Sequence, residues 1–465
     1  MRFVLTLHSH LPWVLHHGRW PHGSDWICEA TLDTYLPLLA LLDRAAAEGV
    51  PTPITLGVTP ILAAQLAHPT LVEEVDAYFA HRLETIATAP DELRASGETD
   101  LLPVVEFWSH HVAALHRLWR SINGDILGAL RRHAEAGRIE LISSAATHGF
   151  LPLLGRDESI RLQLLAGRAE HLRHFGELPL GCWLPECAYR PAGPWQPWPT
   201  APAAEDRSGI EAHLRYAGFR WFTVDAHLAE AGDAWEMYGG KAMRREAQAG
   251  ARSPYRAYEV APVPERGRPV HVVVRDPKTT AQVWSRHGGY PGDEWLHSLY
   301  QLLDTGGMVS PSTGSALLAA SPPTTAVAMQ AGSWGKDGDF SMWMSEEVAW
   351  TWERLWPLEE RFWNAAPEAL RHPAVVPVLE QAARELLLAQ SSDWQFIIST
   401  GAAGDYATRR FTEHCDALES LLPALESGAG DLTGALAAAA RLREIDGPFP
   451  DLVGAIAAAS DVPPR

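Results

Sequence analysis

Several ionisable side chains follow short apolar segments of the chain, and together they limit the chemistry that the sequence can support. The set comprises His8, His10, His148, Glu186, Asp225 and His227. Carboxylates beside imidazoles suit the cleavage of glycosidic bonds, in which paired carboxyl groups do the chemistry and histidines donate hydrogen bonds to sugar hydroxyls. The same residue types can also hold a metal ion.

The metal alternative would use His8 and His10, with Asp225 or His148 as a further ligand. Residues two apart on a strand project to the same side, so the two imidazoles would face one way. No Cys, Asp or Glu stands within a few residues of this pair to complete a local ligand set. We therefore expect no metal and no cofactor, and we expect the histidines to contact the substrate.

The pattern of apolar residues predicts the scaffold that would bring these segments together. Candidate strands are Phe3–Leu7, Ile54–Val58, Ile139–Ser143, Gly181–Leu184, Trp221–Val224, Val270–Val274 and Ala326–Met329. Several are apolar at consecutive positions, as strands buried on both faces must be. Helical patterns such as Asp157–Phe175 lie between them. The alternation predicts a parallel α/β sheet or barrel, whose carboxyl ends would gather the ionisable side chains on one rim.

Three segments depart from this alternation and suggest the domain organisation. Residues 68–137 are long, helical and polar-faced, which indicates a helical insertion between two strands. Residues 229–268 are expected to form a loop excursion above the sheet. After Met344 the strands stop and helical patterns run to the end. We therefore predict a barrel domain at 1–344 and a C-terminal helical domain at 345–465.

The composition restricts the classes of partner. Asp and Glu outnumber Lys and Arg by 57 to 38, and the resulting net charge of −19 argues against nucleic acid or an anionic membrane as partner. The 19 tryptophans outnumber the tyrosines and the phenylalanines, and their flat rings suit stacking on sugars as well as core packing. Four scattered cysteines and an N-terminus without a long apolar stretch predict a cytoplasmic protein with reduced thiols.

Ordered motifs make the carbohydrate interpretation specific. The segments 8–14 (HSHLPWV), 147–153 (THGFLPL) and 183–189 (WLPECAY) resemble the first three motifs of glycoside hydrolase family 57. Further matches resemble its 1,4-α-glucan branching enzymes, and they lie at 223–227, 282–285, 289–292, 332–335 and 392–394. The matches keep the family's order and span most of the chain.

The resemblance implies a fold and a set of roles. The fold would be a (β/α)7-type parallel barrel with a helical insertion and a helical C-terminal domain that completes an α-glucan cleft, for amylose or a glycogen-like polymer. Glu186 would be the nucleophile of a retaining reaction, and Tyr238 would lie at the tip of a mobile loop that favours transfer over hydrolysis. The implied substrate-binding residues are His8, His10, Trp26, His148, Trp183, Asp225, Trp284, Trp334 and Trp394.

One residue that the resemblance requires is not found. A retaining mechanism needs a second carboxyl group about 5–5.5 Å from the nucleophile. The family's acid/base aspartate should fall between residues 289–292 and 332–335, which are only about 40 residues apart in this chain. We therefore expect that a strand and its aspartate are missing and that the barrel wall between 276 and 325 is incomplete. Asp337 and Asp339 are the candidates for a substitute acid.

Three functions fit these observations. The first is a branching transferase of family 57 with impaired turnover. The second is a catalytically inactive, glucan-binding pseudoenzyme that keeps the cleft. The third, less favoured, is a plain α-glucan hydrolase. The missing general acid separates the first from the second, because losing such a group typically costs about 10²–10⁴-fold in rate.

Overall fold

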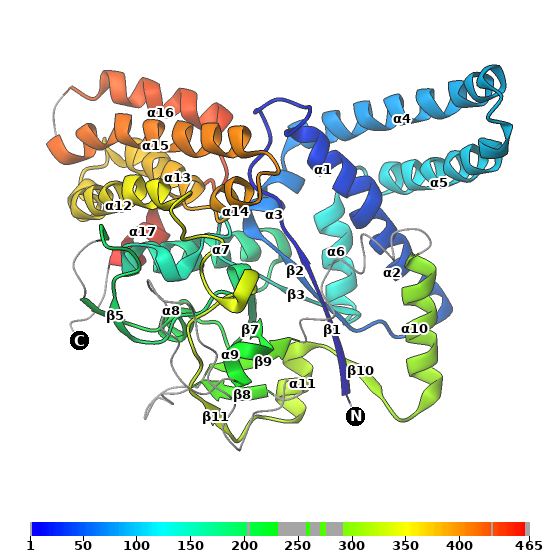
Figure 1. Ribbon diagram of the computed structural model, residues 1–465, viewed down its shortest axis with the longest axis horizontal. Helices are drawn as coiled ribbons and strands as arrows, with labels where there is room; N and C mark the ends of the chain where they lie inside the picture. Colours follow the sequence, from blue (N-terminus) through cyan, green and yellow to red (C-terminus); the bar gives the residue numbers. More distant parts are fainter. Residues whose placement is uncertain are drawn as a thin grey trace.

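The computed structural model describes residues 2–201, 205–230, 257–260, 270–275, 292–428 and 431–460. A curled sheet of mainly parallel strands forms its centre, with helices outside the sheet and a helical region at one end (Figure 1). The strands of this sheet are β1 Arg2–Ser9, β2 Ile54–Val58, β3 Ile139–Ile142, β4 Gly181–Trp183, β7 Trp221–Asp225, β8 Ala257–Val260, β9 His271–Arg275, β10 Ser310–Ser312 and β11 Ala326–Val327. The parallel α/β architecture predicted from the alternation is therefore confirmed.

The sheet has two parts that meet at one bridge. The first has the order β10-β1-β2-β3, and the second has the order β11-β8-β9-β7-β4. Ser143, after β3, bridges in parallel to Cys182 of β4 and joins the two parts. All recorded strand pairs within the two parts are parallel except β8 with β9. In the described part of the chain, pairing does not continue from β11 round to β10, so this sheet is a half-barrel.

Helices of the barrel region pack outside this sheet. They are α1 Ser24–Ala30, α2 Leu36–Glu48, α3 Pro60–Leu66, α6 Ile126–Glu135, α7 Asp157–Phe175, α8 Ile210–Ala217, α9 Ala226–Glu230, α10 Gly292–Gly306 and α11 Gly314–Ala320. A separate antiparallel hairpin consists of β5 Gly193–Trp195 and β6 Glu205–Arg207. No helix among the described residues is long and apolar enough to cross a membrane.

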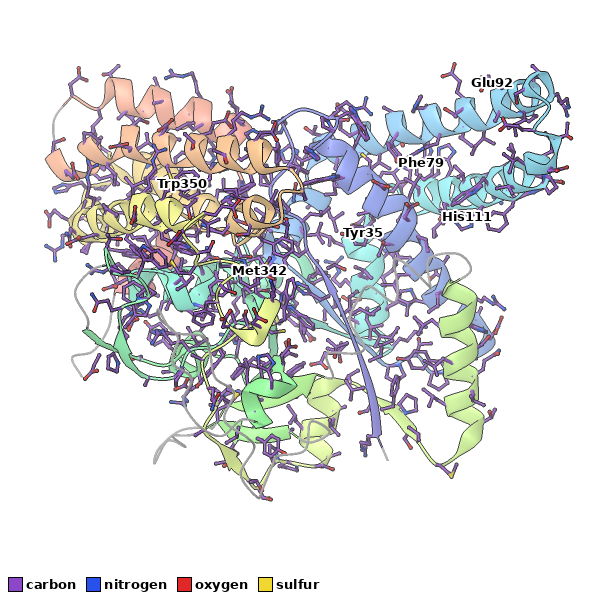
Figure 2. The ribbon with its side chains drawn as sticks, viewed as in Figure 1. Tyr35, Phe79, Glu92, His111, Met342 and Trp350 are labelled. Atoms are coloured by element: carbon purple, nitrogen blue, oxygen red, sulfur yellow. The ribbon has the colours of Figure 1, made fainter. Side chains whose placement is uncertain are left out.

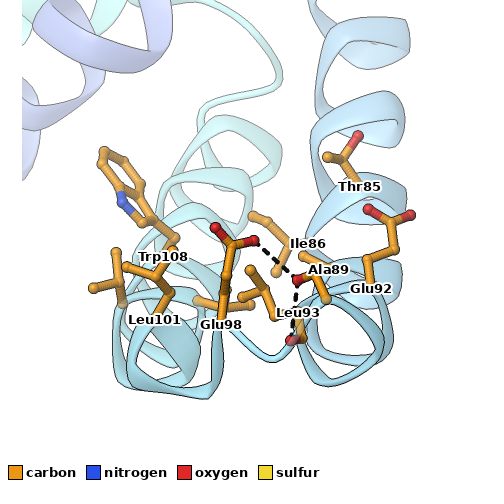
Figure 3. Close-up of a pocket in the computed structure, with 11 residues that line it drawn as sticks. Thr85, Ile86, Ala89, Glu92, Leu93, Glu98, Leu101 and Trp108 are labelled. Carbon is orange, nitrogen blue, oxygen red and sulfur yellow. Dashed lines mark hydrogen bonds between the residues drawn. The ribbon is translucent and has the colours of Figure 1, made fainter.

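A long helical hairpin projects from the barrel region between β2 and β3. Its arms are α4 Pro69–Ser96 and α5 Leu102–Ser121, which pack against each other and extend away from the sheet (Figure 1). A pocket at the outer end is lined by Ile86, Leu93, Leu101 and Trp108, among others (Figure 3). None of the residues that line this pocket belongs to the predicted site.

The C-terminal region consists of helices packed on one another and on the barrel. They are α12 Ala349–Ala369, α13 Val376–Ala389, α14 Asp393–Thr400, α15 Gly404–Ser427, α16 Thr433–Ile445 and α17 Val453–Ser460. Figure 2 shows Trp350 among these helices, where its ring contacts Phe411, and Met342 between them and the sheet. The Ser399 hydroxyl donates to the Met342 carbonyl. The last helix, α17, packs on α7 and ties the chain's end to the barrel.

Helix α7 buries a histidine that should make folding pH-dependent. Burial lowers the pKa of His171 to about 3, and its Nδ1 has no hydrogen-bond partner among the described residues. Below its ordinary pKa of about 6.5, the unfolded chain binds a proton that the folded chain does not. The free energy of unfolding should therefore fall by about 1.4 kcal/mol per pH unit between pH 6.5 and about 3.

Urea unfolding at pH 6.5 and 4.5 tests this expectation. Between pH 6.5 and 4.5, the free energy of unfolding should fall by about 2–3 kcal/mol less in His171→Leu than in wild type, because leucine cannot bind a proton in the unfolded chain. His81→Gln, at an exposed position on α4, is the control and should follow wild type. Equal pH dependence in wild type and His171→Leu would show that His171 is not responsible.

Candidate active site

Glu186 lies at the carboxyl end of β4 in an unusual backbone conformation. The strand ends at Trp183, and the turn Pro185–Cys187 follows. Glu186 and Cys187 both have positive φ, 55° and 47°, a region that side-chain-bearing residues seldom occupy. Two contacts to a neighbouring loop hold the turn: Trp334 N–H donates to the Glu186 carbonyl at 3.1 Å, and Tyr189 pairs with Gly332. Such strain at one carboxylate is typical of functional sites.

Three side chains contact the Glu186 carboxylate, which is only 9% exposed. The Ser392 hydroxyl donates to Oε1 at 2.5 Å, and the Trp334 indole N–H donates to Oε2 at 2.6 Å. His148 Nδ1 lies 3.5 Å from Oε1. Each oxygen therefore receives a donor, and the carboxylate is fixed in orientation.

Three histidines form a stacked group beside this carboxylate. The rings of His10 and His148 stack with centroids 4.1 Å apart, and the ring of His8 stacks on Trp183 at 4.5 Å. His8 Nε2 lies 3.2 Å from His148 Nε2. Burial lowers the pKa of His148, so its imidazole is neutral at pH 7. The structure thus brings His8, His10, His148, Trp183 and Glu186 together.

Asp393 adds a second carboxylate to this region. His10 Nε2 donates to Asp393 Oδ2 at 2.9 Å, and its Nδ1 accepts from the Thr59 hydroxyl at 3.1 Å. Burial alone would raise the pKa of Asp393, but His10, His148 and Ser391 hold it below the ordinary value. The Asp393 carboxylate is therefore ionised, and it orients His10.

Ser392 and Asp393 are site residues that the sequence interpretation missed, although it included them in a motif with Trp394. Trp394 was expected to be a glucan platform. It is 0% exposed, and its indole N–H donates to the Leu388 carbonyl at 2.8 Å. No face of the ring is open to a sugar in this structure, because the ring packs inside the helical region. The signal for Ser392 and Asp393 was their position in that motif, directly before the tryptophan.

The remaining predicted residues occupy different surroundings. Asp225 is buried at the end of β7. Trp334 is 39% exposed beside Glu186, whereas Trp26 lies on α1, where its ring contacts His22 and Tyr406. Tyr238 and Trp284 fall outside the residues that the structure describes.

The two candidate substitute acids lie on the loop that follows Trp334. Asp337 is exposed and has a φ of 65°, and Asp339 accepts from Ser341 N–H at 2.8 Å. Between them, the Gly338 carbonyl accepts from His227 Nε2 at 3.0 Å. A Cβ on Gly338 would come 2.7 Å from that nitrogen, so the contact requires glycine. The loop is thereby anchored at the end of β7, next to the turn that carries Glu186.

Comparisons with known proteins relate the chain to glycosyl hydrolases. A family model described as glycosyl hydrolase family 57 matches residues 4–305, and one described as the C-terminal domain of 1,4-alpha-glucan branching enzyme matches residues 356–455. The chain is 32% identical to the 1,4-alpha-glucan branching enzyme TK1436 of Thermococcus kodakarensis, and the match covers 88% of this chain and 72% of that protein.

Solved structures resemble the chain over almost its whole length. The crystal structure of TK1436 matches with a TM-score of 0.83 at 31% identity and covers 98% of this chain and 96% of its own. A GH57-type branching enzyme from Pyrococcus horikoshii matches with a TM-score of 0.84 at 28% identity, with the same coverage. The α-amylase AmyC of Thermotoga maritima, at 20% identity and a TM-score of 0.74, covers 97% of both chains and shares the fold.

Proposed function

Because this chain belongs to glycosyl hydrolase family 57 and carries that family's branching-enzyme C-terminal domain, we propose that it acts on α-1,4-glucan by retaining glycosyl transfer, with Glu186 as the nucleophile. The single observation that carries this proposal is the environment of the Glu186 carboxylate. It lies at the carboxyl end of a parallel strand, receives a hydrogen bond on each oxygen, and adjoins three histidines.

The chemistry would proceed in two steps. One Glu186 oxygen attacks C1 of a glucosyl unit, the C1–O bond to the rest of the glucan breaks, and a covalent glycosyl-enzyme forms. The leaving oxygen takes the bonding electron pair and a proton. The 6-hydroxyl of another glucan then attacks C1 and gives up its proton, which balances the proton taken up in the first step, and the carboxylate leaves with its electron pair. The histidines would hold sugar hydroxyls, and Trp183 and Trp334 would offer ring surface to the glucan. Tyr238 and Trp284 keep their family-implied roles within this proposal.

Turnover on natural glucan should be impaired. The leaving sugar oxygen is a poor leaving group unless an acid protonates it, and the family's acid/base aspartate has no counterpart in the short interval between 289–292 and 332–335. The shortness of this interval also favours the alternative function, a glucan-binding pseudoenzyme that does not turn over. Asp337 and Asp339 are the candidates that would rescue the first step.

The test compares two substrates of different leaving-group ability. On amylose, branching should be at least about 10²-fold slower than that of an intact relative assayed in parallel, the scale of one lost general acid. With α-maltotriosyl fluoride, whose fluoride leaves without such help, a covalent adduct should form on the peptide that contains Glu186. The adduct should accumulate, because the second step also lacks its base. Mass spectrometry of the intact and digested protein would detect it.

Each result assigns one function. Branching of amylose at the rate of the intact relative would contradict impaired turnover, and Asp337→Asn and Asp339→Asn would then identify the acid. Binding of amylose without any adduct from the fluoride would assign the pseudoenzyme function. An adduct together with slow branching would support the proposal as stated.

A further inference from the structure

We infer that Ser392, from the helical C-terminal region, is a positioning residue that anchors Oε1 of Glu186 and leaves Oε2 to attack the sugar. This inference rests on the proposed function, because it concerns how the nucleophile is held. Its basis is a contact between residues 206 positions apart in the chain, with the hydroxyl 2.5 Å from Oε1.

The hydrogen bonds around Ser392 have one consistent direction. A serine hydroxyl has a single hydrogen, which a carboxylate oxygen can only accept. Ser392 Oγ therefore donates to Glu186 and must accept from His148 Nδ1–H, 3.2 Å away. His148 is neutral, so its Nε2 then accepts from His8 Nε2–H at 3.2 Å. The chain of donors runs from His8 through His148 and Ser392 to the nucleophile.

The backbone of Ser392 is fixed from both sides, so its hydroxyl cannot easily drift. Its N–H donates to the His148 carbonyl at 3.3 Å, in the barrel region. Its own carbonyl accepts from the Trp343 indole at 3.2 Å. The adjacent Ser391 bridges to Gly149. A group held by such supporting bonds keeps a reactive carboxylate within the narrow range of geometry that catalysis needs.

The residues that donate to the two oxygens of Glu186 differ in burial. Ser392, the donor to Oε1, is 0% exposed, whereas Trp334, the donor to Oε2, is 39% exposed. A glucan approaching from solvent therefore meets the Oε2 side. In the first step, Oε2 forms a bond to C1 while the bond from C1 to the leaving atom breaks and that atom takes the electron pair. The bond from Ser392 to Oε1 remains in place throughout.

The experiment measures the rate of adduct formation with α-maltotriosyl fluoride by intact mass, alongside amylose binding and thermal unfolding. Ser392→Ala should react about 10- to 100-fold more slowly, the value of one hydrogen bond to a charged group. Its affinity for amylose should match wild type, and thermal unfolding should show that it stays folded at the assay temperature despite the loss of one buried hydrogen bond. Ser392→Thr, which keeps the hydroxyl, should react within about threefold of wild type. Ser399→Ala, on the helix that Ser392 precedes, is the matched control, because among the described residues that hydroxyl donates to the Met342 carbonyl and not to Glu186.

The outcomes separate the inference from the function on which it rests. If Ser392→Ala forms the adduct slowly but binds amylose like wild type, and Ser392→Thr forms the adduct at nearly the wild-type rate, the results support positioning by the hydroxyl. Three results would overturn the role of Ser392 and leave Glu186 as the nucleophile. They are a wild-type reaction rate in Ser392→Ala, equal slowing in Ser399→Ala, and a Ser392→Thr variant that reacts as slowly as Ser392→Ala. Wild type that binds amylose and forms no adduct would remove Glu186 as the nucleophile, and the role of Ser392 with it.

Discussion

Glu186→Gln should abolish formation of the glycosyl-enzyme, with a fall of at least about 10⁴-fold in the rate of reaction with an activated α-glycosyl fluoride. Glutamine has nearly the same shape, and its carbonyl oxygen can still accept from Ser392 or Trp334. The amide is not a nucleophile of comparable strength, so the chemical step is lost while the site keeps its form. Amylose should therefore bind Glu186→Gln about as tightly as wild type.

A small anion can test whether the carboxylate's position is where attack occurs. In Glu186→Ala, azide should enter the space of the missing side chain and attack C1 from the same face. The product of α-maltotriosyl fluoride would then be the β-azide, identified by its NMR coupling constants. An adduct that persists in Glu186→Gln, or an α-azide product, would assign the nucleophile to another residue.

Arg410→Met should lower the free energy of unfolding by about 3–5 kcal/mol, because it removes one member of a buried ionic network. Arg410, on α15, is 0% exposed. It donates to the Trp13 carbonyl at 3.0 Å and to His414 Nε2 at 2.8 Å. Without it, these acceptors lose their donor, and Asp446, whose Oδ1 lies 3.7 Å from the guanidinium, loses a nearby cation.

The rest of the network explains why the loss should be large. His414 Nδ1 lies 2.8 Å from the buried carboxyl group of Glu385, and His17 Nε2 lies 2.8 Å from Asp446 Oδ1. The network thus joins α13 and α15 to the segment that follows β1. The same segment carries His10. Burial lowers the pKa of His414 to about 3, so a neutral imidazole accepts from Arg410 rather than repelling it.

Urea unfolding at pH 7 measures this effect, with Arg409→Met as the matched control. Arg409 is the adjacent residue, but its side chain is 61% exposed and reaches Glu413 only at 3.9 Å. Its replacement should change stability by less than about 0.5 kcal/mol. Similar losses in both variants would show that the buried network contributes no more than a surface pair.

The sequence predicted some elements to the residue and missed others for physical reasons. Ile54–Val58 and Asp157–Phe175 have the predicted bounds. The first is an apolar run buried on both faces, and the second ends at Gly176 in the left-handed conformation. Arg156 occupies the N-cap position of this helix, and the carboxylate of Asp157, in the first turn, binds Arg207.

Strand β8, which lies in the segment 229–268 that was expected to be a loop, and strand β10 were not predicted from the sequence. Both are short and contain polar residues, so neither shows the continuous apolar run that marks a buried strand. They form because a neighbouring strand offers unpaired backbone groups: β10 pairs with the first residues of β1, which thereby extends beyond the predicted Phe3–Leu7. Pairing of this kind depends on tertiary structure.

The part of the candidate site that lies at strand ends was predictable from the sequence. The part that depends on how the C-terminal helices pack against the sheet was not. His8, His10, His148 and Glu186 converge because parallel strands bring their carboxyl ends to one edge. The contacts of Ser392 and Asp393 require α14 to seat against that edge, and no local pattern marks a serine as the partner of a distant glutamate. The family resemblance implied a sugar-binding role for Trp394, but its indole ring suits a protein core as well as a sugar.

The contact between Glu186 and Ser392 also has a consequence during synthesis. At roughly 5–20 residues per second, the 206 positions between them correspond to about 10–40 s of translation. For that time the strand that bears Glu186 can already be outside the ribosome while the partner of its carboxylate has not been made. A nascent barrel lacks the hydroxyl that orients its nucleophile, so the site cannot reach its final geometry until the helical region has emerged and docked. Truncation anywhere before Ser392 leaves the barrel without this contact, however well its own strands have paired.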